Sequence, residues 1–144
     1  MLVPAGVLVL VVLGAIAVDS AIAFLGQRQL ADAATAAAND AAVAALSDEA
    51  LYGAGTAAHL AVDAGLAQRV VDQALAAQTV RGVEGVTAEV RTAGPVVCVT
   101  LTGYVPYLFA KAVPGAAQGT TVTGRAVASA VEGAPGTVTA VRRC

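Results

Sequence analysis

The sequence predicts an α+β fold, in which a long N-terminal hydrophobic helix is followed by a second helix and a small antiparallel β-sheet of three to four strands. Three observations lead to this expectation. The chain begins with an apolar run, continues through an alanine-rich stretch, and alternates apolar with polar residues in its last third. Its 144 residues allow one modest domain beside the first helix.

The first 25 residues contain no charged side chain before Asp19. A run of about 18 apolar residues is enough to cross a bilayer as a helix, so we expect this segment to be buried in lipid or in other protein. Pro4 is compatible with a helix, because a proline in the first turn removes only an N–H that has no intrahelical partner. Residues 1–25 are therefore predicted to form a hydrophobic helix of a membrane or a protein interior.

The helix is expected to continue to residue 46, because the stretch from residue 20 to 46 has no proline and one glycine, Gly26. A helix over residues 4–46 would be about 65 Å long, roughly twice the hydrocarbon thickness of a bilayer. Its outer half is amphipathic and predicts a domain packed against it. The residues expected near the packed face are Leu30, Ala33, Ala34, Ala37, Ala41 and Ala44.

Residues 26–144 are expected to hold the rest of this helix and a globular head. A turn region that includes Tyr52 is predicted first, then a second helix over residues 56–78. The apolar stripe of that helix consists of Leu60, Ala64, Ala67, Val71 and Leu75.

Period-two alternation in the last third predicts the sheet. Strands 86–91 and 97–102 are expected to form a hairpin around the turn at residues 93–95, and a third strand fits residues 120–131. A fourth strand is possible at residues 137–142. Residues 104–113 are expected to connect the strands through a helical turn whose aromatic side chains plug the sheet.

The composition is 58% hydrophobic and 12% charged, with a net charge of −2. Nucleic-acid binding and disorder are disfavoured, since there is no basic field and no polar, low-complexity stretch. The sequence has no calcium-loop spacing and no glycine-rich phosphate cradle, so no cofactor or metal is expected. His59 is the one histidine in the sequence. We interpret it as a surface or packing residue and expect no enzyme activity.

Cys98 on a predicted strand and Cys144 at the C-terminus lack the spacing of a metal site. A disulfide between them is predicted, which would stabilise the fold by about 4 kcal/mol in the chain-entropy model. The alternative is one buried thiol and one free terminal thiol.

Asp19 lies beside Ser20 inside an otherwise apolar run. A carboxylate in such a place usually marks a membrane boundary, is paired, or is functional. Asp19 either marks the outer edge of the bilayer or meets a cation of another chain, with the Met1 amine or Arg28 as candidates. Small residues that would let neighbouring helices approach closely are Gly6, Gly14, Ala15, Ala17, Ala21 and Gly26.

The uncharged apolar run, the acidic residue near its end and the following segment Gln27-Arg28-Gln29-Leu30-Ala31-Asp32-Ala33-Ala34 resemble the N-terminal region of TadE-like and TadG-like proteins of the tight-adherence (Flp) pilus system. The resemblance covers about the first third of the chain. It implies a pilin-like subunit or pseudopilin, export through the cytoplasmic membrane, helix-mediated assembly and no catalysis. No basic leader precedes Met1, which indicates a processed form or a leaderless member, and Ala5 stands where type IV pilins typically carry a glutamate.

The sequence therefore predicts a structural subunit whose hydrophobic helix rests in the inner membrane and then enters the core of an extracellular filament. Expected partners are copies of itself or other pilin-like subunits, the membrane before assembly, and the pilus assembly machinery. The residues predicted to carry helix packing and assembly are Gly6, Gly14, Ala15, Asp19, Ala21, Gly26 and Arg28. The alternatives are a single-pass envelope protein whose head binds a partner without polymerising, and a membrane-tethered enzyme with a pocket around His59.

Overall fold

A computed structural model of the chain describes residues 2–46, 61–112 and 114–130. It contains the predicted long helix, second helix and antiparallel sheet, so the α+β fold is confirmed. The elements in chain order are helix α1 (Leu2–Ala44), helix α3 (Ala64–Ala77), strand β1 (Glu84–Ala93), strand β2 (Val96–Pro106), the 3-10 turn η1 (Ala110–Ala112) and strand β3 (Gly119–Ser129).

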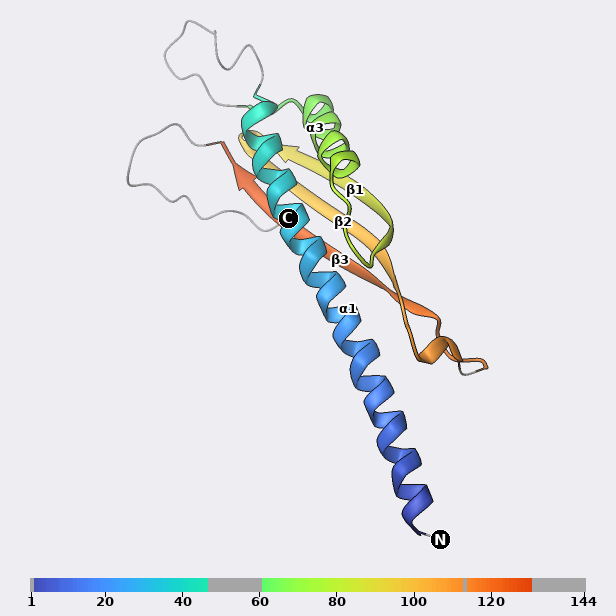
Figure 1. The fold of residues 1–144 in the computed structure, drawn as a ribbon. Coiled ribbons are helices and arrows are strands. Elements are labelled where there is room, and N and C mark those ends of the chain that lie inside the picture. Colours follow the sequence, from blue (N-terminus) through green and yellow to red (C-terminus); the bar gives the residue numbers. More distant parts are fainter. Residues whose placement is uncertain (1, 47–60, 113, 131–144) are drawn as a thin grey trace, which may run out of the picture.

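Helix α1 is one uninterrupted helix that runs along the whole length of the described structure (Figure 1). Its bounds agree with the predicted range of residues 4–46 to within two residues at each end. The sheet and α3 lie beside its C-terminal half, and its N-terminal part extends beyond them (Figure 1). The long helix therefore has two environments.

The sheet is antiparallel with strand order β1-β2-β3. The predicted hairpin is confirmed, because Ala93 pairs with Val96 across a turn in which Gly94 has φ 59°. This positive φ suits glycine, which has no Cβ to clash with the backbone. Strand β3 pairs with β2 along its full length and confirms the third predicted strand. The possible fourth strand, residues 137–142, lies outside the described residues.

Helices α1 and α3 cover one face of the sheet. Helix α1 lies over β2 and β3, and α3 lies beside α1 and over β1. The inward residues of β2 are buried, as period-two alternation requires, and they are Val97, Val99, Leu101 and Val105. From α1 the core receives Leu30, Ala34, Ala37 and Ala41, four of the residues predicted for its packed face. Ala33 is half-buried, and Ala44 is exposed at the last turn of the helix.

Small residues let α1 approach the sheet closely. A Cβ added at Gly124 of β3 would lie 2.5 Å from the backbone carbonyl carbon of Leu30, a distance that no real contact allows. Gly26 of α1 is also buried, and a Cβ added there would meet the side chains of Val105 and Val83. The alanines of α1 continue this close contact along the packed half of the helix, which we define as residues 30–44.

Helix α3 begins later than predicted. Residues 61–63 are not helical, and Asp63 caps the helix, because its Oδ1 accepts a hydrogen bond from the Leu66 N–H at 2.6 Å. Ala67 and Val71 of the predicted stripe are buried and Leu75 is half-buried, whereas Ala64 is exposed in the first turn. The remaining stripe residue, Leu60, lies outside the described residues.

The end of α1 is joined to the start of α3 by backbone pairing. Asp63 N–H donates to the Ala45 carbonyl at 2.9 Å, and Leu46 and Val62 form an antiparallel bridge. Val62 N–H also donates to the Gly94 carbonyl at the hairpin turn, at 3.0 Å. Residues 46 and 62 are therefore held side by side and tied to the sheet.

Candidate functional site

The candidate functional site is the free half of α1, which we define as residues 4–18. Its large side chains are exposed on every side of the helix, with exposed fractions from 42% at Val18 to 70% at Leu10. The helix is long and apolar enough to cross a membrane, and 6% of its most apolar part is buried within the chain. Helix α1 is therefore a candidate membrane-spanning helix.

The small residues predicted for assembly lie on two different sides of α1. Gly14 and Ala21 are seven residues apart, hence on one side of the helix, and both are exposed. Asp19 and Gly26 are also seven residues apart, and both are buried on the side that faces the head. Asp19 follows Gly14 by five residues, so the two sides lie about 140° apart around the helix axis.

The structure sorts the other predicted residues between these two sides. Gly6 and Gly14 are exposed, and in the described part of the chain no atom outside their own helix turn lies within 4 Å of a Cβ added at either residue. Arg28, seven residues after Ala21, is exposed as well, whereas Ala15 is half-buried. The predicted residues that are open to another molecule are therefore Gly6, Gly14, Ala21 and Arg28. Gly26 is instead covered by the chain's own sheet.

Asp19 is 6% exposed and accepts three backbone hydrogen bonds from residues that follow β2. Its Oδ1 accepts from the N–H groups of Leu108 at 2.8 Å and Phe109 at 3.1 Å, and its Oδ2 accepts from Ala110 at 2.8 Å. The ammonium group of Lys111 adds a favourable charge interaction. Amides of its own head are therefore partners of Asp19 within the chain. A contact of Asp19 with the Met1 amine or Arg28 of another chain stays a prediction.

Residues 107–111, which we call the tip, follow β2, include the first two residues of η1 and lie beside α1. Tyr107 is half-buried, but Leu108 is 55% exposed and Phe109 is 49% exposed. The prediction that the aromatic side chains plug the sheet is therefore wrong for Phe109. The reason is that Asp19 binds the backbone of the tip, which leaves the side chains of Leu108 and Phe109 at the surface.

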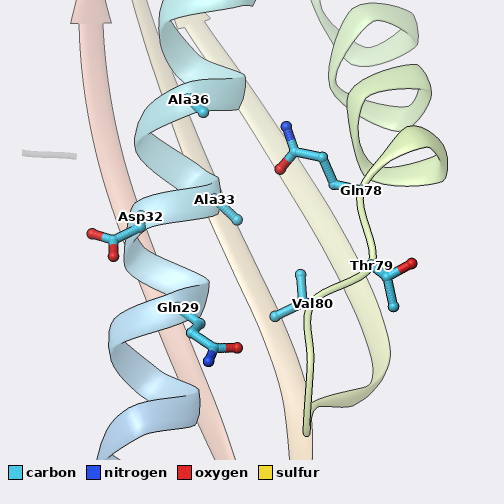
Figure 2. A pocket seen from close by; sticks show the side chains of 7 residues that line it. All are labelled: Gln29, Asp32, Ala33, Ala36, Gln78, Thr79 and Val80. Carbon is cyan, nitrogen blue, oxygen red and sulfur yellow. The ribbon is translucent and has the colours of Figure 1, made fainter.

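A shallow hollow of about 340 Å³ lies between α1 and the segment that joins α3 to β1. The lining residues are Gln29, Asp32, Ala33 and Ala36 of α1 together with Gln78, Thr79 and Val80. In Figure 2, the side chains of Asp32 and Thr79 point away from the space between α1 and residues 78–80. Asp32 is the one ionisable side chain of this lining, so the hollow lacks an acid–base pair. His59 lies outside the described residues, and within the described ranges no three His, Cys, Asp or Glu side chains gather as a metal site.

Cys98 is half-buried on β2, where it pairs with Arg91 of β1 and Val127 of β3. It is not a free thiol. Cys144 lies outside the described residues, so the disulfide between Cys98 and Cys144 stays a prediction.

Comparison of the chain with protein-family models, with curated proteins and with solved structures finds no match.

Proposed function

We propose that the chain is a pilin-like structural subunit, which is anchored in the inner membrane by the N-terminal hydrophobic part of α1 and then assembles through this helix into an extracellular filament. The observation that carries the proposal is the apolar surface of residues 4–18, which is exposed around the whole helix. The resemblance of residues 1–34 to TadE-like and TadG-like proteins supports it.

Energetics favour a covered state of the free half. Burial of one Val, Leu or Ile side chain contributes about 1.5–3 kcal/mol relative to exposure in water. The free half carries nine such exposed side chains, namely Val7, Leu8, Val9, Leu10, Val11, Val12, Leu13, Ile16 and Val18. Lipid and neighbouring helices cover this surface about equally well, so transfer from the membrane into a filament core is feasible.

The side of α1 that faces away from the head offers a contact for a neighbouring helix. Gly14 and Ala21 recur there at a spacing of two turns, and Arg28 continues the same line. Small residues let two helix backbones come close and gain van der Waals contact, which drives helix association in an apolar medium. Asp19 is already satisfied within the subunit, so assembly through this side buries no unpaired carboxylate.

Gly14→Leu tests the proposal. We expect purified full-length chain to form filaments when detergent is removed, visible by negative-stain electron microscopy and recovered by sedimentation. Gly14→Leu should reduce the sedimented fraction strongly, because the larger side chain keeps helices apart. Among the described residues, no atom outside the local turn of α1 lies within 4 Å of a Cβ added at Gly14, so the head should stay folded.

The matched control is Val12→Leu, which enlarges an exposed side chain on nearly the opposite side of the helix. It should assemble like the original chain. Normal filaments from Gly14→Leu, or equal loss in both variants, would argue against close helix contact through Gly14.

A second candidate is a single-pass envelope protein whose head binds a partner without polymerising. It is favoured by the same exposure of the free half, since a solitary helix in lipid needs no protein cover. This candidate predicts a monomer at all concentrations in detergent and no filaments after detergent removal. Sedimentation equilibrium over a wide concentration range separates the two.

A further inference from the structure

The tip lies against α1 at Asp19, at the end of the free half. Three hydrogen bonds tie its backbone to Asp19, which follows directly after the last residue of the free half. Leu108 and Phe109, the exposed apolar residues of the tip, therefore stand beside a long apolar helix surface. The position of Asp19 along α1 therefore fixes the position of the tip along the helix axis.

A bilayer that covers the free half extends along α1 as far as Asp19 and the tip. Residues 4–18 rise about 21 Å, whereas the hydrocarbon core of a bilayer is about 30 Å thick. The apolar surface of α1 also continues past Asp19, because Phe24 is 65% exposed and Leu25 is 54% exposed. Asp19 and the tip thus lie within the depth at which α1 still presents apolar side chains outward.

The contacts of Asp19 suit such a position. A carboxylate near hydrocarbon is costly unless its oxygens are satisfied, and both oxygens of Asp19 accept backbone N–H groups while its side chain is covered. The tip supplies those donors and the cover. Lys111 is exposed at the end of the tip, where its flexible side chain can extend toward phosphate groups.

From these contacts we infer that the tip is a membrane-contact site, in which Leu108 and Phe109 enter the boundary between headgroups and acyl chains beside α1. This inference rests on the membrane-anchored stage of the proposed function and adds a second point of contact. The helix alone would leave the head free to rotate and tilt over the bilayer. The helix and the tip together fix one side of the head toward the lipid.

The sequence has no tryptophan, so a single introduced tryptophan reports its own environment. Phe109→Trp places the probe in the tip. Leu10→Trp, at the most exposed of the large hydrophobic residues of the free half, tests insertion of α1. Val43→Trp is the negative control, because Val43 is 76% exposed at the far end of α1, about 36 Å from Asp19 along the helix.

Each full-length variant is reconstituted at low protein-to-lipid ratio into phosphatidylcholine and phosphatidylglycerol vesicles, with or without lipids brominated in the upper acyl chain. We expect several-fold quenching of Phe109→Trp and Leu10→Trp with a blue-shifted emission, and no quenching of Val43→Trp. The quenching of Phe109→Trp should be unchanged on further dilution with lipid.

The outcomes separate the two proposals. Quenching of Leu10→Trp without quenching of Phe109→Trp overturns the membrane contact of the tip and leaves the anchored helix intact. A blue shift of Phe109→Trp that disappears on dilution also overturns it, because a second copy would then be the occupant. If Leu10→Trp is not quenched, α1 is not inserted, and the membrane-anchored stage of the proposed function fails together with the inference.

Discussion

The two halves of α1 belong to one continuous helix but use different side chains. The free half, residues 4–18, carries Val, Leu and Ile, and these side chains are exposed. The packed half, residues 30–44, carries mainly alanine, and the alanines that face the sheet are buried. Both halves are helical although Val and Ile have a lower helix propensity than alanine, so helix propensity does not explain the large side chains of the free half.

Small side chains are needed where the partner is a rigid sheet. Leu30 and the alanines beyond it lie so near β3 that Gly124 has no room for a Cβ. Large side chains are suited to a fluid or adaptable partner, because they offer more apolar area and the partner can adjust to their shape. Along α1, large side chains are thus exposed on the free half, whereas mainly small side chains face the head on the packed half.

The same substitution in the two halves should give the largest contrast. Leu30→Ala removes a fully buried side chain and should lower the free energy of unfolding of the head by about 2–5 kcal/mol. Leu10→Ala removes an exposed one and should leave it unchanged. Urea unfolding of the full chain in a non-ionic detergent, followed by circular dichroism, measures both. Equal losses of unfolding free energy in the two variants would show that the two halves of α1 contribute equally to the stability of the head.

Glycine substitutions should give a smaller contrast of the same kind. Gly124→Ala forces a methyl group against the backbone of α1 and should destabilise the head by about 1–3 kcal/mol. Gly14→Ala meets no neighbouring atom and should leave the stability of the head unchanged, with slightly higher helix propensity in the free half. The same unfolding measurement applies. A neutral Gly124→Ala would mean that α1 can move away from β3 at little cost.

Asp19 stands at the boundary between the two halves, and its loss should loosen the tip without unfolding the head. Asp19→Ala leaves the N–H groups of Leu108, Phe109 and Ala110 without their acceptor. Their amide hydrogen exchange should become about tenfold faster, because these bonds hold the tip closed. Exchange of β2 amides such as Leu101 should stay slow. Unchanged exchange at residues 108–110 would show that the tip is held by other contacts.

The smallest effect is expected on the outer side of the packed half. Thr35 is exposed, and its hydroxyl group donates to the Ala31 carbonyl within the same helix. Thr35→Ala should change the free energy of unfolding by no more than about 0.5 kcal/mol, since it removes no contact with the sheet. A large loss there would indicate that the packed half has a second partner.

Periodicity made much of the fold predictable. The uninterrupted helix, the hairpin at Gly94 and the third strand follow from local signals, namely absent breakers, alternation and a turn glycine. The start of α3 was harder to predict, because alanine favours helix on both sides of Asp63 and the cap alone fixes the boundary.

The partner of Asp19 could not be predicted from local pattern. Leu108 lies 89 residues away in the chain, and a backbone N–H carries no residue-specific signal. The exposure of Phe109 was missed for the same reason, because an apolar residue in a loop is expected inside until something binds the loop backbone. The predicted site residues of α1 could likewise be divided between head and surroundings only once the side that faces the sheet was known.

The pairing of Leu46 with Val62 has a practical consequence for engineering. Both ends of the intervening stretch are fixed by backbone bonds, so the fold is insensitive to how much chain joins them. Each doubling of a connection costs only about 0.6 kcal/mol of closure entropy. A peptide epitope or an affinity tag grafted between residues 46 and 62 should therefore be displayed at the end of α1 opposite its N-terminus.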